Sequence, residues 1–313
     1  MPEIKTWKIE KPWVHMRCAL GEGPFYNEET NEVRWLDITE RKIHFVNASV
    51  GPSSLRTITT DHLIGVTADV DGAPKKLVAA AKEGFAWIDR ETGKMEWIAR
   101  IYEAEGAETV RTRMRMNDGA VDSKGRLWAG GMQDTLVVPG FPGPVGSLWR
   151  LDPDGSAHKM IDGGIAVTNG IAWNCADTVM YHTDSGPNNI YAYEFDAENG
   201  EISNGHVFFH WEEKIKGEVG LLDGLVADED DCLWSAIYWG YKVIRISPSG
   251  QHIGTIELPA PCISAVVFMG TELAITSASN REKVPTEYGG NLFRIDVGVR
   301  GRQRYKFKSS IAI

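Results

Sequence analysis

The chain has 313 residues, of which 42% are hydrophobic and 24% are charged, a balance typical of a globular, core-forming protein. Its formal net charge is −10 and its pI is near 5.4, and no Lys/Arg-rich run is present, so the basic stripe expected of a nucleic-acid binder is missing. No stretch approaches the ~18 uninterrupted apolar residues of a membrane span, and the N-terminus lacks the apolar segment of a secretory signal.

The cysteines match no CxxC metal motif and give no sign of an oxidising compartment. They stand at Cys18, Cys175, Cys232 and Cys262. We expect mostly buried thiols in a cytoplasmic protein with no nucleic-acid or membrane partner.

A short apolar pattern recurs six times along the chain, at intervals of 40 to 54 residues. Each copy is rich in β-branched and aromatic residues and is bounded by Gly, Asp or Asn, which is typical of a strand. The copies lie at 31–38, 75–81, 125–132, 177–185, 231–239 and 271–279.

Three further apolar segments accompany each copy. One precedes it, at 21–27, 63–70, 117–123, 169–175, 223–229 and 263–269. The first of the two that follow lies at 41–47, 84–93, 146–155, 188–200, 241–250 and 290–298. The second lies at 54–60, 94–100, 158–163, 206–212, 252–259 and 304–310.

Six repeats of four strands each predict an all-β chain, a six-bladed β-propeller with four antiparallel strands per blade. Residues 1–313 would form this single domain. The first strand of each blade should lie innermost, and the terminal segments 4–10 and 305–313 should pair to close the ring. A pair of β-sandwiches is the alternative, but it would not explain six repeats in register.

A polar residue, usually followed by Gly, stands near the start of most innermost strands. In chain order these positions hold Glu22, Ile64, Asn117–Asp118, Asn169, Asp223 and Ile263. Since innermost strands run roughly along the propeller axis, these side chains should converge on one mouth of the channel. Buried carboxylates without a partner are unfavourable, and hard oxygen ligands suit Ca²⁺, Mg²⁺ or Mn²⁺. Taken singly, each residue could instead cap an Asx turn before Gly.

Four separated segments resemble the family of gluconolactonase, regucalcin (senescence marker protein) and luciferin-regenerating enzyme. They lie at 18–38, 115–132, 168–185 and 221–240, and the resemblance covers about residues 15–300. It implies a six-bladed β-propeller that hydrolyses sugar lactones and related small esters with one divalent cation. The identity of that cation, Ca²⁺, Mg²⁺, Mn²⁺ or Zn²⁺, is left open.

By motif, the resemblance assigns the metal ligands to Glu22 of GEGP, Asn169 of TNG and Asp223 of LDG. It assigns the substrate contacts to Arg115 and Asn117 of RMND.

The segment after the GGM turn departs from the family pattern. Some sugar-lactonase members carry an acidic pair there that holds substrate hydroxyls, but here Asp134 is followed by Thr135. Asp134 stays a substrate-binding candidate, while the close match to a gluconolactone-type substrate is weakened. The Pro- and Gly-rich insertion 133–146 is expected to form a lid or rim loop, and 279–290 a second one.

As a mechanism, the cation would polarise the lactone carbonyl, and Asp223 would ligate it with one oxygen and activate water with the other. Arg115 would hold a substrate hydroxyl or the developing carboxylate through its planar donor fork. Asn117 would hydrogen-bond a hydroxyl or the ring oxygen.

Other residues near the expected mouth have less definite roles. Asp184 and Ser185 either line the mouth or cap a turn, and His182 is interpreted as a packed histidine. Tyr238 and Trp239 are candidates for a flat wall at the rim.

The sequence therefore predicts a metal-dependent lactonase acting on a small, sugar-type lactone. One alternative is a phosphotriesterase- or fluorophosphatase-like hydrolase, which would favour an apolar pocket. Another is a calcium-binding propeller without turnover. Serine-hydrolase chemistry lacks support because no GxSxG motif is present.

Overall fold

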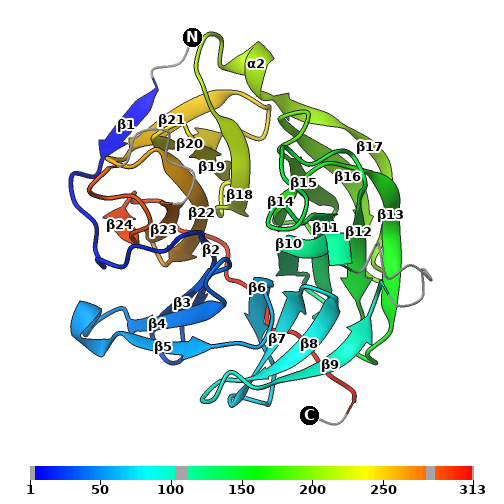
Figure 1. The fold of residues 1–313 in the computed structure, drawn as a ribbon. Coiled ribbons are helices and arrows are strands. Elements are labelled where there is room, and N and C mark those ends of the chain that lie inside the picture. Colours follow the sequence, from blue (N-terminus) through cyan, green and yellow to red (C-terminus); the bar gives the residue numbers. More distant parts are fainter. Residues whose placement is uncertain (1–3, 103–111, 280–285, 312–313) are drawn as a thin grey trace.

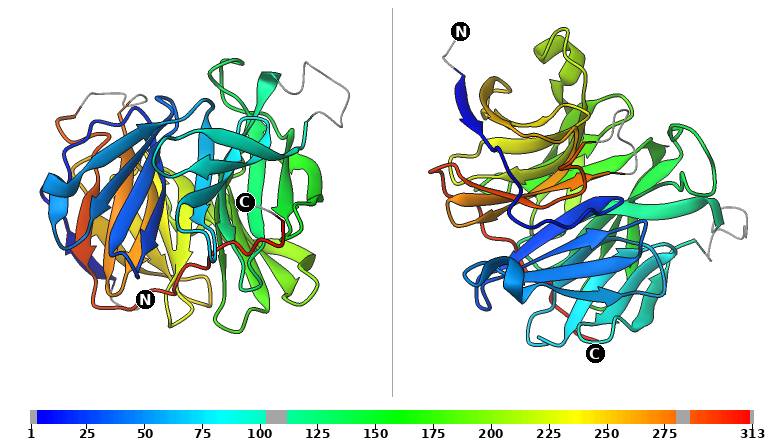
Figure 2. Two further views of the ribbon diagram at one scale, coloured as in Figure 1. Left: turned by 90° about the horizontal axis from the view of Figure 1, so that it is seen from below. Right: turned by 60° about the vertical axis from the view of Figure 1, so that its left-hand side comes forward.

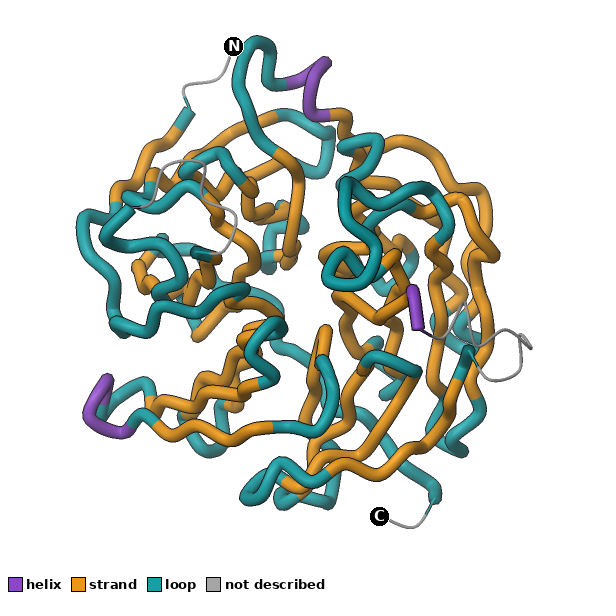
Figure 3. The backbone as a smooth tube through the Cα atoms, viewed as in Figure 1, coloured by secondary structure: helices purple, strands orange, loops and turns teal. Residues whose placement is uncertain are grey.

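The computed structural model describes residues 4–102, 112–279 and 286–311. Within them, four four-stranded sheets and one eight-stranded sheet surround a central axis, as in a β-propeller (Figure 1). Strands dominate the whole ring, as the backbone trace in Figure 3 shows. The helices are short, such as η1 (Gly51–Ser54) and α2 (Trp211–Lys214), and none in the described ranges is long and apolar enough to cross a membrane.

The four-stranded sheets are antiparallel meanders of consecutive strands. The first contains β2 (Gly21–Asn27), β3 (Glu32–Asp37), β4 (Lys42–Asn47) and β5 (Arg56–Thr59). The second contains β6 (Ile64–Asp69), β7 (Lys76–Ala81), β8 (Gly84–Asp89) and β9 (Met95–Arg100). The third contains β10 (Met114–Val121), β11 (Leu127–Gln133), β12 (Gly146–Leu151) and β13 (Ala157–Ile165). The fourth contains β14 (Thr168–Trp173), β15 (Val179–Asp184), β16 (Asn189–Asp196) and β17 (Glu201–His210).

The eight-stranded sheet combines two successive sets of strands. The first set is β18 (Leu221–Ala227), β19 (Leu233–Tyr238), β20 (Lys242–Ile246) and β21 (His252–Glu257), with β1 (Lys5–Lys8) added at its edge. The second set is β22 (Cys262–Met269), β23 (Glu272–Ala278) and β24 (Phe293–Asp296). A single residue pair, Tyr238 with Cys262, links the two sets.

The first strand of each set faces the centre of the ring. β2, β6, β10, β14, β18 and β22 contact one another in this order, and β22 returns to β2. This closed circle of inner strands is the arrangement that the repeat pattern predicted, and it brings equivalent positions of distant segments together.

Two of the repeats share a turn between their first two strands. Asp122 follows β10, accepts backbone N–H bonds from Lys124 and Arg126, and accepts the indole N–H of Trp128. Asp228 follows β18 and repeats this pattern, with the indole of Trp234 at 2.9 Å. In each case one buried carboxylate accepts hydrogen bonds from the backbone of the turn and from the indole of the following tryptophan. This explains a repeated Asp and Trp six residues apart.

Among the described residues, segments 4–10 and 305–311 do not pair with each other, so the predicted pairing of the terminal segments is wrong there. β1 instead pairs in parallel with β21, and Val14 pairs with Leu292 next to β24. Residues 304–310 are not an outer strand of the last set either. They cross the channel end, where Phe307 forms a parallel bridge with Val70.

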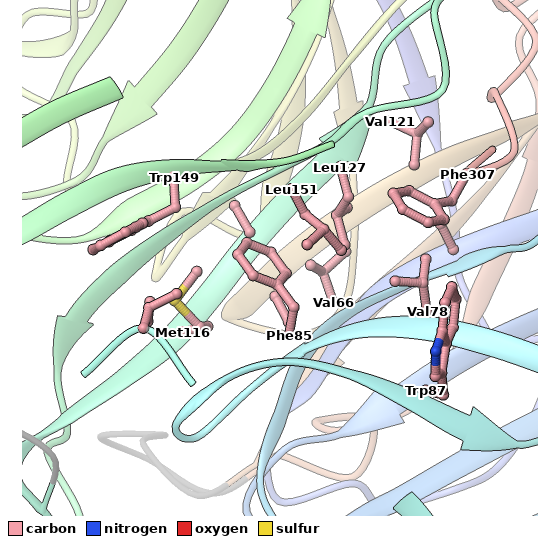
Figure 4. Close-up of a cluster of buried hydrophobic side chains, with 14 of the residues drawn as sticks. Val66, Val78, Phe85, Trp87, Met116, Val121, Leu127, Trp149, Leu151 and Phe307 are labelled. Carbon is pink, nitrogen blue, oxygen red and sulfur yellow. The ribbon is translucent and has the colours of Figure 1, made fainter. Parts of the chain in front are cut away.

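The apolar core lies between neighbouring sheets. Its largest cluster joins inner and second strands with residues far apart in sequence, including Val66, Leu127 and Phe307 (Figure 4). The ring of Phe307 meets that of Trp87 edge-on, at 5.8 Å between centroids. The C-terminal segment is therefore anchored by burial as well as by backbone bonding.

Candidate functional site

Glu22, Asn169 and Asp223 lie at β-bulges in three inner strands, not in turns. The pairing register shifts between Glu22 and Phe25 in β2, and again between Thr168 and Ile171 in β14. β18 has the same shift around Asp223. A bulge bends the strand and re-aims a side chain that regular pairing would direct elsewhere. All three side chains are buried.

The glycines beside these positions permit close approach of the next inner strand. A Cβ at Gly170 would lie 2.0 Å from the backbone nitrogen of Leu225 in β18. A Cβ at Gly65 would lie 2.1 Å from the carbonyl oxygen of Asn117 in β10. Since real side chains never come so close, glycine is required for adjacent inner strands to meet, and the ring stays narrow.

One pocket at the channel mouth contains most of the residues predicted from the sequence. It is lined by Leu20, Glu22, Arg115, Asn117, Met132, Phe141, Pro142, Val167, Asn169, Ser185, Leu221, Asp223, Tyr238 and Trp239. The structure thus brings Glu22, Asn169 and Asp223 together with Arg115 and Asn117.

A chain of hydrogen bonds fixes the polar side of this pocket. The Arg115 guanidinium donates to Asn117 Oδ1 at 2.6 Å, and Asn117 Nδ2 donates to Asn169 Oδ1 at 3.0 Å. Asn169 Nδ2 then donates to Ser185 Oγ at 2.7 Å. Ser185 in turn donates to the carbonyl of Leu222, the residue before Asp223. The network spans three sheets and orients Asn169 with its oxygen directed away from Ser185.

The two carboxylates of the pocket repel each other in a buried environment. Burial, and then the charge of Asp118, raise the pKa of Glu22 to about 8. Burial, then Glu22 and Asp118, raise the pKa of Asp223 well above its usual value. Arg115 opposes both shifts only weakly. Asp223 Oδ1 is buried and has no hydrogen-bond partner within the described part of the chain.

These donors fit a divalent cation. An unpartnered buried carboxylate oxygen, a second carboxylate and an amide oxygen are hard ligands of the kind that Ca²⁺ and Mg²⁺ take. Across residues 4–102, 112–279 and 286–311, no group of three His, Cys, Asp or Glu side chains is arranged to hold a metal. A cation here would therefore rely on Asn169 beside the two carboxylates, and on water or substrate for its other positions.

Asp118 follows Asn117 but faces deeper into the channel. It lines a separate cavity with Gly119, Gly224 and Arg304. Burial raises the pKa of Asp118 to about 6, and the charge of Arg304 opposes this shift. Arg304 belongs to the C-terminal segment, which in the left view of Figure 2 rises from the lower left across the strands to the C-terminus near mid-height.

Asp134 is not brought into the pocket. Its side chain is only 1% exposed, and its carboxylate accepts from Lys82 Nζ at 2.5 Å. It also accepts from the backbone N–H of Leu136, at the start of the 133–146 loop. The geometry makes Asp134 the anchor of that loop, because a carboxylate already paired and buried cannot reach a ligand in the mouth.

The neighbouring candidates divide between two roles. Asp184 accepts backbone N–H bonds from Ala166, Val167 and Gly186, so it caps a turn. Ser185 lines the pocket and bonds Asn169. His182 is buried, and burial lowers its pKa to about 4.

The sequence analysis missed most of an upper tier of the pocket. Leu20, Val167 and Leu221 each stand two residues before a polar ring position and line the same pocket, as does Arg115, the one member of this tier that was predicted. Strand side chains repeat with period two, so counting back two residues from each ring position would have found this tier. Phe141 and Pro142 come from the 133–146 loop. A loop lacks the period-two alternation of a strand, so the sequence pattern does not predict which of its side chains reach the pocket.

A circle of inner strands with clustered oxygen donors at its mouth defines a β-propeller protein with a candidate cation site. Residues 20–279 match the family described as SMP-30/Gluconolactonase/LRE-like region, and the chain belongs to this family.

Two curated relatives and one solved structure are similar over almost their full lengths. Regucalcin of Gallus gallus is 30% identical over 303 residues, 93% of this chain and 95% of that protein. The pentonolactonase of Haloferax volcanii is 27% identical over 304 residues, 94% of this chain and 96% of its own. The structure of a luciferin-regenerating enzyme superposes with a TM-score of 0.83 at 27% identity, covering 93% of this chain and 96% of that one.

Proposed function

We propose that the protein opens the ring of a small lactone by hydrolysis, with a divalent cation held by Glu22, Asn169 and Asp223. The observation that carries this proposal is the buried carboxylate pair at the channel mouth, whose pKa values are raised and one of whose oxygens has no partner among the described residues. Membership of a family that includes a named pentonolactonase supports the reaction class.

A divalent cation supplies Lewis acidity, which polarises a carbonyl and makes water more acidic. The donors suit Ca²⁺, Mg²⁺ or Mn²⁺ on chemical grounds, and Zn²⁺ also remains to be tested.

The reaction adds water to the lactone carbonyl carbon, breaks the acyl carbon–oxygen bond and yields a hydroxy acid. We assign the general base to Asp223, because a carboxylate can ligate through one oxygen and accept the water proton at the other. That proton then moves to the leaving ring oxygen, and the new carboxylic acid ionises. Arg115 donates to the developing carboxylate, and it is itself oriented by Asn117.

Asn117 is proposed as a substrate contact that also positions Asn169. Asp134 is left out of the substrate set because it is buried against Lys82. Ser185 takes a positioning role, since its hydroxyl links Asn169 to the backbone before Asp223.

The test is hydrolysis of five- and six-membered lactones, followed by proton release. The protein is first treated with EDTA, and Ca²⁺, Mg²⁺, Mn²⁺ or Zn²⁺ is then added back. Activity restored by a cation in the parent protein and absent in Asp223→Ala supports the proposal. A folded, cation-loaded protein that opens no lactone overturns it.

The apolar residues of the pocket favour one alternative, a phosphotriesterase-like hydrolase. Eight of the pocket's side chains are apolar or aromatic, among them Met132, Val167 and Trp239. A dialkyl aryl phosphate therefore belongs in the same panel. Hydrolysis of that ester alone would favour the alternative, whereas cation-dependent stabilisation without any turnover would favour a calcium-binding propeller.

We further propose six blades in a single domain spanning the chain. The eight-stranded sheet would count as two blades, since within the described ranges its halves are joined by one strand-pairing position, Tyr238 with Cys262, and six first strands form the inner circle. Cytoplasmic residence and the lack of nucleic-acid and membrane partners stay predictions from composition.

A further inference from the structure

The upper tier of the pocket is mostly apolar. Of the four residues two positions before the polar ring, Leu20, Val167 and Leu221 are aliphatic, and only Arg115 is polar. Leu20 and Val167 directly precede β2 and β14, Arg115 and Leu221 lie in β10 and β18, and all four line the same pocket as the ring residues. Consider a ligand whose carbonyl lies near Glu22 and Asp223. Nearer the mouth it would meet aliphatic side chains at three of the four positions of this tier.

The uncharged polar side chains below this tier, Asn117, Asn169 and Ser185, are already hydrogen-bonded to one another. Asn117 uses its amide nitrogen on Thr168 and Asn169, and its oxygen on Arg115. Ser185 accepts from Asn169 and donates to Leu222. A ligand with several hydroxyls would have to compete for these bonds, and each hydroxyl left unpaired would weaken binding.

The 133–146 loop adds Phe141 and Pro142 to the same pocket. Its first turn is fixed, because Asp134 is paired with Lys82 and accepts the N–H of Leu136, while Val138 donates to the Asp134 carbonyl. Phe141 nevertheless leaves 55% of its surface exposed. A large exposed aromatic side chain at a pocket edge is a surface that an apolar ligand group would cover.

Tyr238 and Trp239 supply further aromatic wall. Their rings meet edge-to-face with centroids 5.3 Å apart, and Trp239 adopts a left-handed backbone conformation with φ of 65°. Such a conformation is unfavourable for a bulky side chain. The fold maintains it at the residue that presents an indole to the pocket.

We propose that the substrate is a lactone whose ring carries an apolar substituent, an aryl group or an alkyl chain, rather than several hydroxyls. The substituent packs against Leu20, Phe141 and Trp239. This inference rests on the proposed lactone hydrolysis and specifies its substrate class. It also fits the absence of an acidic partner next to Asp134, since no group is then needed to hold sugar hydroxyls.

The experiment compares two five-membered lactones with the same ring. One carries a phenyl group at the γ position, and the other is a hydroxylated pentono-1,4-lactone. We expect kcat/KM for the phenyl lactone to exceed that for the hydroxylated one by at least tenfold. Phe141→Ala should reduce this ratio about tenfold through loss of apolar contact. The control is Val145→Ala, on the same loop and 54% exposed but outside the pocket, which should leave the ratio unchanged.

Binding of the corresponding lactams gives a second readout, because amides are not turned over on this timescale. Tighter binding of the phenyl lactam, weakened by Phe141→Ala, supports the inference even if neither lactone is hydrolysed, in which case only the proposed reaction fails. A hydroxylated lactone hydrolysed as well as the phenyl one, or equal binding of the two lactams, overturns the inference and leaves lactone hydrolysis intact.

Discussion

The two ends of the buried carboxylate cluster in the central channel differ in their electrostatics. At the end toward the C-terminal segment, the far end from the mouth, Asp118 lines a cavity with Arg304, whose charge opposes the rise in the pKa of Asp118. Asp118 still lies close enough to Glu22 and Asp223 for its charge to raise their pKa values. At the mouth, Glu22 and Asp223 share one nearby guanidinium, Arg115, whose donors already serve Asn117 and Met116. The far end is thus supplied with a cation by the chain itself.

This difference indicates which end is built for a ligand. Burying like charges is unfavourable unless an opposite charge accompanies them. The pKa of Asp118 rises only to about 6, while that of Glu22 rises to about 8. Without a bound ligand, the carboxylates at the mouth lack enough positive charge nearby, and a divalent cation would supply it.

The largest expected effect comes from exchanging one carboxylate at each end for its amide. Asp223→Asn removes the negative charge of a proposed ligand and the proposed base, so kcat/KM should fall on the order of a thousandfold. Asp118→Asn removes a carboxylate that does not line the mouth pocket and acts on Glu22 and Asp223 only through its charge, so kcat/KM should change by no more than about tenfold. Steady-state kinetics on a lactone that the parent opens would test both. Equal losses in the two variants would erase the distinction between the ends.

The second prediction concerns the cation-free protein and pH. Because the pKa of Glu22 is about 8 in the folded chain against 4.5 ordinarily, the folded state retains a proton that the unfolded state loses between these values. The free energy of unfolding should therefore fall as pH rises from 5 to 8. A cation at a hundred times its Kd should restore about 2.7 kcal/mol, and its affinity should be higher at pH 8, where fewer protons compete.

Melting temperatures of EDTA-treated protein at pH 5, 6.5 and 8, with and without each cation, measure this effect. Glu22→Gln is the matched variant, since it removes the titrating group and should flatten the dependence. A cation that stabilises equally at pH 5 and 8 would argue against binding at these carboxylates.

Much of this architecture was predictable because the repeats of a propeller produce a periodic sequence pattern. The alternating apolar strands recur every 40 to 54 residues, and the ring positions of Glu22, Asn169 and Asp223 follow from register. Three of the four cysteines are buried, as composition suggested. These features depend on local pairing, which a sequence pattern records.

The failures lie where the chain leaves the repeat. Residues 304–310 have the apolar alternation of a strand, but they bind across the channel through Phe307 and Arg304. Asp134 has the chemistry of a substrate ligand, but Lys82, 52 residues earlier, takes its carboxylate. Contacts between non-equivalent positions of different repeats produce no periodic sequence pattern. Neither the path of the C-terminal segment nor the Lys82–Asp134 pair could therefore be predicted from the sequence.

A smaller effect is expected at the far end. Arg304→Met should leave Asp118 without its opposing charge and raise its pKa further. The variant should then lose about 1–2 kcal/mol at pH 8, since one pKa unit corresponds to 1.36 kcal/mol. At pH 5, with Asp118 protonated in both proteins, the two should unfold alike. Adding Asp118→Asn should restore the loss, as a urea double-mutant cycle would measure. No pH dependence of the difference would mean that Arg304 acts through packing alone.

An effect of the same order isolates burial from charge pairing, using His182. Burial alone lowers its pKa to about 4 from 6.5, so the unfolded chain takes up a proton between these values before the folded one does. Stability contributed by the neutral ring is present above pH 6.5 and is lost as pH falls toward 4. Relative to His182→Leu, the parent should lose about 1–2 kcal/mol of unfolding free energy between pH 7 and 5. Urea unfolding of both at the two pH values measures it. Equal losses of unfolding free energy in the parent and His182→Leu would mean that the imidazole is already hydrated or charged in the folded protein. Burial without an opposing charge would then shift pKa values in this propeller less than the comparison of Glu22 with Asp118 implies.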